Sequence, residues 1–584
     1  MIVLRENAGI VPFFTVQVGT WAELREAVMS AGTVPTTIEI INNIELPAGA
    51  AFNAIVIAAG QEITLTSVPG ELHIIQRTGG TQRHFFVDGT LTLENVIISG
   101  NYPILTANHG GIEVRAGGSL FMEAGSVIRN NRNVGNTSAS GVFVSGADAA
   151  FTMNGGEISY NSTLSVSGTT SSGSATVFVN NGAVFIMNGG IIRDNTGRFG
   201  GGVRIGQTVA VGGDNRMYMY GGEIYNNTAF FGGGVNVEFG TFTMIYGVIR
   251  NNIATALQNN TTLPLSAGRG GGGIFIQNSG ILNMSGGTID DNRSYTHGGG
   301  VMSGTPASNQ FNMAGGTIFG NIAADTGGGV RMTNGVFTMT DGAISNNTAA
   351  TNGGGIWLGI GTATANARLN MTGGQISDNT AAAGNGGGIF TSAYVYADPL
   401  PLTAYANILA AMGVFFGNIA GGGLFAPPSN YYDFSFGYLL TNYDINFVGP
   451  NPRVRVTFVL NGGNVAGDTA NLVYSIPFGY TIGEAQVMPM PVRPGFVLIG
   501  WTRDDDPTIL SVVEVEALRI EENTVFIAQW EAVQPPPPCP PCPPCPPCPP
   551  CPPCPPCPPR PPCSPCSRSS QKSLSVKERL CVFL

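Results

Sequence analysis

The chain has 584 residues, of which 84 are Gly, about twice the usual share, and only 11% are charged. The formal net charge is −10, and this acidic composition argues against nucleic acid or an anionic membrane as the main partner. All ten cysteines lie between Cys539 and Cys581, so the preceding 538 residues are neither a disulfide scaffold nor a thiol enzyme. No apolar run reaches the roughly 18 residues that cross a bilayer, so we expect no membrane insertion.

The N-terminal segment, residues 1–19, does not have the pattern of a secretory signal. Arg5 and Glu6 stand where the apolar region of a signal peptide would begin, and no small-residue cleavage site follows. These residues therefore predict no export signal. Three explanations stay open, which are an incomplete N-terminus, another export route, and retention inside the cell.

Residues 20–29 predict a short amphipathic helix. Thr20 followed by Glu23 is a capping-box pattern, which marks a helix start. Three apolar side chains then fall on one helical face, namely Trp21, Leu24 and Val28. We expect this helix to close one end of a stack of strands, in which residues 37–120 form the first, less regular coils.

One pattern recurs through residues 121–425: an apolar residue, Met two residues later, and then Gly, Ile and Asn three, five and eight residues after the Met. Met153 and Met371 are 218 residues apart over seven steps, which gives a period of about 31 residues, typical of a solenoid. Blocks of three glycines followed by an apolar residue recur in the same region. They begin at Gly200, Gly232, Gly271, Gly298, Gly327, Gly353, Gly386 and Gly421.

Each repeat contains three short segments that alternate apolar and polar residues between Gly and Asn, which predicts strands and not helices. Such a chain coils so that every strand pairs with its equivalents one repeat before and after. We therefore expect a parallel β-helix over residues 20–449, with Asn at a left-handed bend of each repeat and bonded to a neighbouring coil. The Phe-x-Met segments send both side chains inward, and a stack of aromatic rings is expected at Phe151, Phe185, Phe242, Phe311 and Phe337.

The triple-glycine and Phe-x-Met-x-x-Gly-x-Ile-x-x-Asn blocks resemble the right-handed β-helix repeats of bacterial surface proteins, and are similar in style to those of chlamydial polymorphic outer membrane proteins. The opening Thr20-Trp-Ala-Glu-Leu-Arg-Glu-Ala27, followed by Thr37-Ile-Glu-Ile40, is similar to the N-terminal cap of pectate-lyase-like adhesins. Together these resemblances cover about three quarters of the chain. They imply a right-handed, adhesin-like β-helix in the cell envelope or outside the cell.

A second module is expected at residues 452–533, where the glycine triplets have stopped. The segment resembles the Listeria-Bacteroides repeat, also called the internalin B-repeat. The motifs that carry the resemblance are Val456-Thr-Phe458 with Asn461-Gly-Gly463, Arg493-Pro-Gly-Phe496 with Gly500-Trp-Thr502, and Ala528-Gln-Trp530. The resemblance implies a small β-grasp-like module of an extracellular bacterial protein.

Residues 534–584 form a Pro/Cys-rich tail, with 21 of the 39 prolines between positions 535 and 565. This composition predicts a polyproline II rod and then a disordered end. Seven cysteines recur at every third residue and therefore line one edge of the rod, where we expect disulfide-linked self-association between chains. They are Cys539, Cys542, Cys545, Cys548, Cys551, Cys554 and Cys557.

We expect the β-helix to bind an extracellular glycan or protein along its flank, with no catalysis, no cofactor and no metal. Exposed aromatic side chains are the expected stacking platforms, and the candidates are Tyr160, Tyr220, Tyr225, Tyr246 and Trp357. The alternative is a polysaccharide lyase or glycoside hydrolase, because parallel β-helices also carry those activities and use clustered carboxylates. The acids at the equivalent repeat position fall in distant coils, which argues against this alternative; they are Asp194, Asp291 and Asp378.

Two further sets of polar residues have competing interpretations. Asp290 and Asp291, with His297 six residues later, form either a metal or acid–base site or a solvated corner, and we favour the corner. Arg193 and Arg250 occupy the same repeat position in separate coils, where we expect them to be exposed to solvent.

Overall fold

The computed structural model describes residues 14–46, 54–77, 82–103, 110–133, 137–163, 174–206, 214–255, 270–305, 308–359, 367–391, 407–411, 413–422, 444–445, 453–477, 480–485, 488–520 and 523–533. The start of the chain up to residue 13 and the whole Pro/Cys-rich tail, with its seven candidate cross-linking cysteines, lie outside the described residues.

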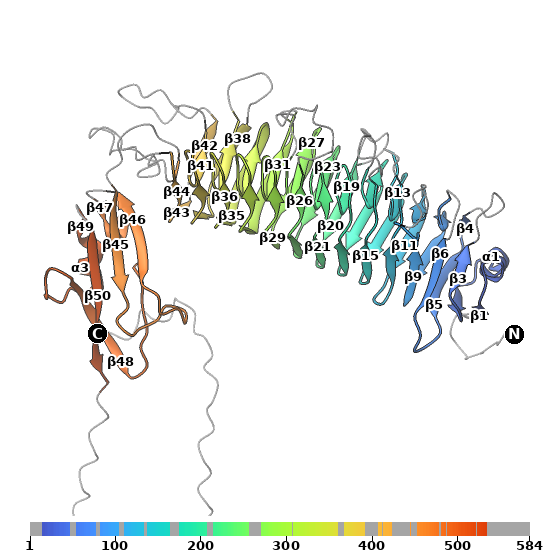
Figure 1. The fold of residues 1–584 in the computed structure, drawn as a ribbon, viewed down its shortest axis with the longest axis horizontal. Helices are drawn as coiled ribbons and strands as arrows, with labels where there is room; N and C mark the ends of the chain where they lie inside the picture. Colours follow the sequence, from blue (N-terminus) through green and yellow to red (C-terminus); the bar gives the residue numbers. More distant parts are fainter. Residues whose placement is uncertain are drawn as a thin grey trace, which may run out of the picture. The chain divides into compact units, whose positions relative to one another are not determined.

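The chain between residues 14 and 445 coils as a parallel β-solenoid, in which each strand pairs with its equivalents in the coils before and after it (Figure 1). The largest sheet contains two ladders, and β32 (Gln310–Phe319) and β35 (Gly335–Ser345) run through both. The first ladder also contains β1 (Phe14–Val18), β2 (Thr36–Ile40), β5 (Glu62–Ser67), β8 (Thr90–Leu93), β11 (Ser119–Met122), β14 (Ala150–Met153), β17 (Val184–Met187), β20 (Asn215–Met219), β24 (Gly240–Met244), β28 (Ile281–Met284), β38 (Ala367–Met371) and β42 (Ile408–Ala411). The second also contains β3 (Ile44–Leu46), β6 (His73–Arg77), β9 (Val96–Ser99), β12 (Val127–Arg129), β15 (Glu157–Ser159), β18 (Ile191–Arg193), β21 (Glu223–Tyr225), β25 (Val248–Arg250), β29 (Thr288–Asp290), β39 (Gln375–Ser377) and β43 (Val414–Phe416).

Two further parallel sheets complete the coils. We call the longer one the outer-column sheet, and its strands are β4 (Ile55–Ile57), β7 (Phe85–Val87), β10 (Ile112–Val114), β13 (Val142–Ser145), β16 (Val177–Asn180), β19 (Val203–Ile205), β23 (Val235–Glu238), β27 (Ile274–Gln277), β31 (Val301–Ser303), β34 (Val330–Met332), β37 (Ile356–Leu358) and β41 (Ile389–Phe390). The short sheet contains two-residue strands from the later coils: β22 (Thr228–Ala229), β26 (Ile253–Ala254), β30 (Arg293–Ser294), β33 (Ile322–Ala323), β36 (Thr348–Ala349), β40 (Thr380–Ala381) and β44 (Ile419–Ala420).

One apolar core runs through the coils from Val18 to Ile445. The expected aromatic stack is confirmed, because all five phenylalanines are fully buried in one register column. Phe311 and Phe337 stack with their ring centres 4.4 Å apart and 2° between the ring planes. Met217 and Leu282 fill the positions between the phenylalanines, and their flexible side chains suit such gaps.

The glycine triplets turn the chain into the outer-column sheet. Gly232, the first of its triplet, has a φ of 66°, a left-handed conformation that a side chain disfavours. At Gly233 a β-carbon would come within 2.3 Å of the carbonyl oxygen of Gly272 in the next coil. The triplets are therefore required by a left-handed turn and by the close stacking of adjacent coils.

The repeated asparagines form a buried hydrogen-bonded column, in which each Nδ2 donates to Oδ1 of the next asparagine at 2.9–3.0 Å. Its members are Asn131, Asn161, Asn195, Asn227, Asn252, Asn292, Asn321, Asn347, Asn379 and Asn418. The expected bond between coils is thus confirmed, but the expected left-handed bend at Asn is wrong. The bend lies one residue earlier, as at Asp194, with a φ of 55°. Asn195 itself aims its backbone N–H at Oδ1 of Asn227, 3.1 Å away.

The expected N-terminal helix is present as α1 (Trp21–Ser30), with Thr20 as its N-cap and a complete capping box with Glu23. Its buried side chains include Trp21, Leu24 and Val28, which belong to the same apolar core as the first strands. Figure 1 shows α1 at the end of the solenoid where the chain begins.

Residues 453–532 form a separate mixed sheet with its own core. Its strand order is β46-β45-β50-β48, with β45 antiparallel to β46 and parallel to β50. Phe458 and Trp501 meet edge to face at 5.0 Å in this core. The elements are β45 (Arg453–Val459), β46 (Leu472–Pro477), β47 (Tyr480–Thr481), α2 (Ile482–Ala485), β48 (Phe496–Arg503), α3 (Val512–Ala517), β49 (Arg519–Ile520) and β50 (Thr524–Ala532). None of the helices that the structure describes is long and apolar enough to cross a membrane.

Candidate functional site

Parallel pairing places five polar side chains of successive coils in one column on the second ladder. Ile158, Ile192, Ile224, Ile249 and Ile289 of the same strands are buried, so the next residue of each strand lies on the outer side. Neighbouring coils of a sheet are about 4.8 Å apart. We call this set the arginine–tyrosine column, and it contains Ser159, Arg193, Tyr225, Arg250 and Asp290 in that order.

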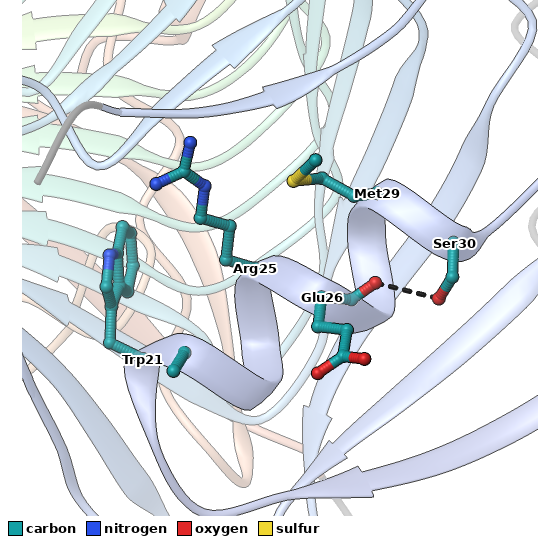
Figure 2. Close-up of a pocket in the computed structure, with 6 residues that line it drawn as sticks. Trp21, Arg25, Glu26, Met29 and Ser30 are labelled. Carbon is teal, nitrogen blue, oxygen red and sulfur yellow. Dashed lines mark hydrogen bonds between the residues drawn. The ribbon is translucent and has the colours of Figure 1, made fainter.

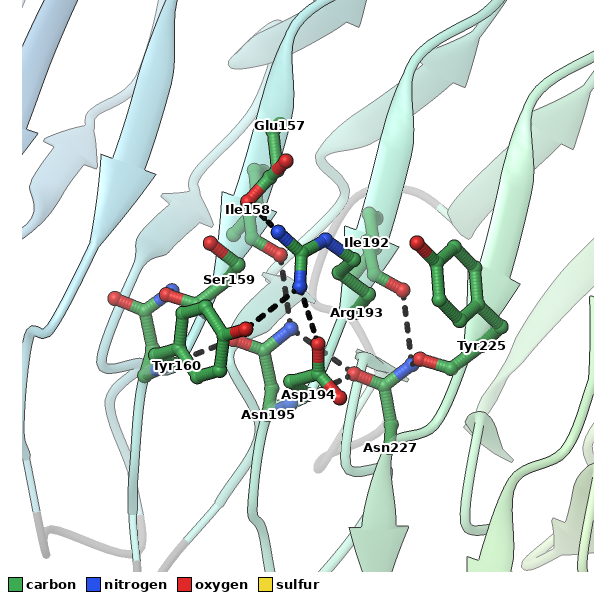
Figure 3. A network of polar contacts seen from close by, with 11 residues as sticks. Glu157, Ile158, Ser159, Tyr160, Ile192, Arg193, Asp194, Asn195, Tyr225 and Asn227 are labelled. Carbon is green, nitrogen blue, oxygen red and sulfur yellow. Dashed lines mark hydrogen bonds and ion pairs between the residues drawn. The ribbon is translucent and has the colours of Figure 1, made fainter.

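Arg193 is the centre of the first polar network of this column (Figure 3). Its Nη2 lies 2.8 Å from Oε1 of Glu157, and its Nη1 donates a 2.9 Å hydrogen bond to the hydroxyl of Tyr160 and contacts Asp194. Burial opposes the charge of Arg193, but the hydrogen bonds to Tyr160 and Asp194 and the charge of Glu157 outweigh it, so the pKa of Arg193 is raised. The expectation that Arg193 is simply solvent-exposed is therefore wrong.

Tyr160 has a backbone conformation that its side chain disfavours. Its φ is 56°, in the left-handed region, where a bulky residue is unusual. The corresponding residues of other coils are Asn, Asp or Gly, and examples are Asn130, Asp194, Asn226 and Gly320. Local strain of this kind concentrates at functional sites. The fold therefore does not require a tyrosine at position 160, and would accept Asn, Asp or Gly there with less strain.

A second ion pair lies two coils further along the column. Nη2 and Nε of Arg250 donate to Oε2 of Glu223 at 2.9 and 3.2 Å, and the guanidinium carbon lies 5.3 Å from the centre of the Tyr225 ring. The hydrogen bond and the charge of Glu223 raise the pKa of Arg250. Arg250 is thus also paired, although much of its side chain remains exposed.

Asp290 continues the column after Arg250, whereas the solvated corner that the sequence favoured lies at Asp291, which is exposed and has a left-handed φ of 51°. The carboxylate of Asp290 is half-buried, and its Oδ1 has no hydrogen-bond partner among the described residues. Burial, and then the charge of Asp291, raise the pKa of Asp290 above its ordinary value near 3.8, while Arg250 opposes the shift. Asp290 is half-buried because it lies on β29, between the strands of adjacent coils, instead of at the bend.

His297 does not join Asp290 and Asp291. Its Nδ1 lies 3.3 Å from Oδ2 of Asp325, beside the outer-column sheet. In the part of the chain that the structure describes, no group of three or more His, Cys, Asp or Glu side chains could hold a metal ion. Register pairing also keeps the other acids apart. Each of them comes directly after the last residue of a second-ladder strand, and three coils separate Asp194 from Asp291 and Asp291 from Asp378.

Four of the five expected aromatic platforms lie on the strands of the second ladder or directly beside them. Tyr160 and Tyr225 contact the arginines of the column, and Tyr220 and Tyr246 lie in the turns between the two ladders, 48% and 65% exposed. Tyr218 adds a ring stacked against Tyr220 at 6.3 Å, which the sequence analysis missed. We call these five tyrosines with Arg193 and Arg250 the tyrosine flank.

Trp357 belongs to another face. It lies on β37 of the outer-column sheet, with the guanidinium carbon of Arg331 4.3 Å from the centre of its ring and Phe390 stacked beyond it at 6.3 Å. Glu157 and Glu223, the partners of the two arginines, were not predicted from the sequence. Aligning the repeats would have revealed them, because each Glu stands just before the buried isoleucine of the coil that directly precedes its arginine.

A shallow cavity of about 430 Å³ lies on α1 (Figure 2). The residues that line it all belong to this one helix, and they are Trp21, Ala22, Arg25, Glu26, Met29 and Ser30. Ser30 donates its hydroxyl hydrogen to the carbonyl oxygen of Glu26 at 2.7 Å, which is a local helix bond. This surface holds one cation and one anion on an otherwise apolar face, and it lies apart from the tyrosine flank.

Comparisons of the chain with protein-family models, with curated proteins and with solved structures give no match.

Proposed function

We propose that the chain is a binding protein whose tyrosine flank holds an extended ligand, most simply a glycan. The observation that carries this proposal is the alternation of tyrosine rings with paired arginine and carboxylate groups in successive coils. Aromatic rings cover the apolar faces of sugars, and charged pairs offer donors and acceptors to hydroxyl groups. A repeated surface of this kind suits a repeating polymer better than a small molecule.

The sequence resemblances extend this proposal to the setting of the protein. We infer a right-handed solenoid capped by α1 over residues 20–449, a β-grasp-like B-repeat module over 452–533, and a location in the cell envelope or outside the cell. The strand order β46-β45-β50-β48 supports the module, and the burial of the inner face of α1 supports the cap. Fractionating cells and probing envelope, medium and cytoplasm for the protein tests the location, and a purely cytoplasmic protein would contradict it.

Binding to neutral and acidic oligosaccharides, measured by calorimetry on the full chain, tests the tyrosine flank. The double substitution Tyr220→Ala and Tyr246→Ala should weaken binding at least tenfold, because each removes an exposed ring. Tyr295→Ala is the matched control, since Tyr295 is 45% exposed but lies beyond β30 on another side of the coil. Equal affinities of the double variant and the control would rule out the flank.

An enzymatic function is the second candidate, and Asp290 is the observation in its favour. A half-buried carboxyl with a raised pKa beside Arg250 is the type of group that general acid–base catalysis employs. Release of reducing ends or unsaturated sugars from polysaccharides, abolished by Asp290→Asn, would establish a glycoside hydrolase or polysaccharide lyase. Absence of product from acidic and neutral polysaccharides leaves the binding function.

The cysteine tail supports a further proposal, covalent linkage between chains. In a polyproline II helix three residues make a turn of about 9.3 Å, so in that conformation neighbouring tail cysteines would lie beyond the roughly 7 Å between α-carbons that a disulfide tolerates. Pairing between two chains is the remaining geometry. Non-reducing electrophoresis of oxidised protein should show multimers that reductant or Cys-to-Ser substitution removes, whereas monomer alone contradicts the linkage.

A further inference from the structure

The outer-column sheet carries a second column of side chains on its outward side, distinct from the tyrosine flank. Register pairing aligns Phe178, Arg204, Asn236, Phe275, Met302, Arg331, Trp357 and Phe390. Two arginines stand in this column, and both lie against aromatic rings. Their surroundings differ in one respect, which is the presence of a carboxylate.

Arg204 has a carboxylate supplied by the fold. Its Nη2 and Nε donate to Oε2 of Glu238 at 2.7 and 3.2 Å, and both side chains are buried. Glu238 comes from β23, the neighbouring strand, so the column itself neutralises this arginine. This arrangement is expected, because an ionised group is retained in a protein interior when it is paired and hydrogen-bonded.

Arg331 lacks such a partner. Its Nε and Nη1 are buried and have no hydrogen-bond acceptor among the described residues, although the residue as a whole is partly exposed. No carboxylate in the described part of the chain forms an ion pair with it either. Asp325 is nearby, but its Oδ1 accepts a 2.7 Å hydrogen bond from Thr351, and its Oδ2 faces His297. Burial lowers the pKa of Arg331 to about 10, so it remains a cation at neutral pH.

A second unpartnered polar atom lies beside it. The hydroxyl of Thr333 is buried without a hydrogen-bond partner in the described part of the chain, and Thr333 is two residues from Arg331, in the bend that directly follows β34. Only Thr333 and Asn334 join β34 to β35, whereas six residues join β31 to β32 and eight join β37 to β38. The coil of Arg331 therefore has a shorter connection at this edge of the sheet than either of these two coils.

Arg331 also lies close enough to His297 for its charge to act on that ring. Nδ1 of His297 is in turn 3.1 Å from Oγ1 of Thr326. Unsatisfied buried donors are costly, and charged ones most of all, so two guanidinium N–H groups without acceptors favour the binding of an acceptor. Stacking on Trp357 orients the guanidinium plane in advance of binding.

We propose that Arg331 and Thr333, beside His297 and Trp357, form a binding site for an oxyanion, a carboxylate or a sulfate group of a ligand. The guanidinium supplies charge and N–H donors, and the threonine hydroxyl supplies a further donor. This site is independent of the tyrosine flank, because it lies on a different sheet and takes a charged group instead of sugar faces.

Titration calorimetry of the full chain with sodium sulfate, with trigalacturonate and with neutral galactose tests the site at constant ionic strength. Sulfate or trigalacturonate should bind, and galactose should not. Arg331→Gln should weaken binding at least tenfold, whereas Arg368→Gln removes the same charge from an exposed arginine of β38 and should have no effect. Affinities of the two variants within twofold of each other would overturn the proposal, and the preferred probe distinguishes sulfate from carboxylate.

A measurement on the unaltered protein guards against a variant that fails to fold. Burial, and then the charge of Arg331, lower the pKa of His297 to about 4. An oxyanion bound to Arg331 would offset that charge, so the pKa of His297, followed by NMR of one of only four histidines, should rise when the probe is added. An unchanged pKa at saturating probe also overturns the proposal.

Discussion

Nδ2 of Asn418 donates a 2.9 Å hydrogen bond to Oδ1 of Asp444, so the asparagine column ends on a carboxylate. Inside the column each side-chain amide both donates and accepts, and its Nδ2 also donates to the carbonyl of an isoleucine in a neighbouring coil. A terminal residue needs only to accept, which an Asp side chain does. The next residue, Ile445, pairs with Ile389 and closes the described part of the core.

The column predicts that an interior asparagine matters more than its single side chain suggests. Asn292→Ala removes the acceptor of two hydrogen bonds from Asn252 and two donors of its own, all buried. We expect a loss of about 2–4 kcal/mol in the free energy of unfolding, because buried groups are left unpaired. Chemical denaturation measures it.

Asn312→Ala is the control for that substitution. Asn312 also donates a 2.9 Å hydrogen bond to an asparagine one coil away, Asn283, but on the outer side of the sheet, where water replaces the partner. We expect a change of less than about 0.5 kcal/mol. Equal losses from the two substitutions would show that burial of the column contributes nothing.

The strained tyrosine predicts a conflict between stability and binding. Tyr160→Asn replaces a bulky residue at a φ of 56° by the residue type found there in other coils, so the protein should become about 1 kcal/mol more stable. The same change removes the hydrogen bond and the ring that meet Arg193, so oligosaccharide binding should weaken. Thermal melting and calorimetry on one preparation measure both effects.

Tyr246→Asn separates strain from the loss of a ring. Tyr246 is an exposed tyrosine without a left-handed backbone, so its replacement should weaken binding and leave the melting temperature unchanged. If both variants melt at the temperature of the original protein, Tyr160 stores no strain.

The repeats made the fold predictable from the sequence, because each feature recurs at a spacing that only stacked strands explain. The inward Phe-x-Met column and the capping box at Thr20 needed nothing beyond local pattern. The position of the left-handed residue was not predictable in the same way. Both Asp194 and Asn195 are residue types that accept a left-handed bend, and the hydrogen bond to Asn227 decides between them.

The candidate site was less predictable, since it depends on pairs from different coils. Arg193 and Glu157 are 36 positions apart in the chain, and they meet because adjacent strands bring the outer positions of two coils together. Trp357 was grouped with the tyrosines by residue type alone, although its strand belongs to another sheet. Side-chain chemistry identified candidates, and register determined which of them share a surface.

Asp290 predicts a stability that depends on pH in the acid range. A carboxyl whose pKa is raised in the folded state favours folding when it is protonated, so its ionisation destabilises the protein as the pH rises above about 4. Asp290→Asn should therefore raise the melting temperature at pH 7, and the gain should disappear as the pH falls through the raised pKa of Asp290. Asp291→Asn removes the adjacent charge and should give a smaller gain. A loss of stability in Asp290→Asn at pH 7 would instead mean that the attraction to Arg250 outweighs burial.

His297 predicts the opposite dependence. Burial and the charge of Arg331 hold its pKa at about 4, against an ordinary 6.5, while Asp325 opposes the shift. The unfolded chain therefore binds a proton more readily, and stability should fall as the pH drops from 6.5 towards 4, by up to about 3 kcal/mol at 1.4 kcal/mol per pKa unit. His297→Gln should flatten this part of the curve of unfolding free energy against pH.

His73→Gln is the matched control. The His73 side chain is 13% exposed and the His297 side chain 12%, but His73 lies on β6, among the first coils. A curve that keeps its slope in His297→Gln would place the acid sensitivity elsewhere and weaken the case that Arg331 is an unneutralised neighbour of this histidine.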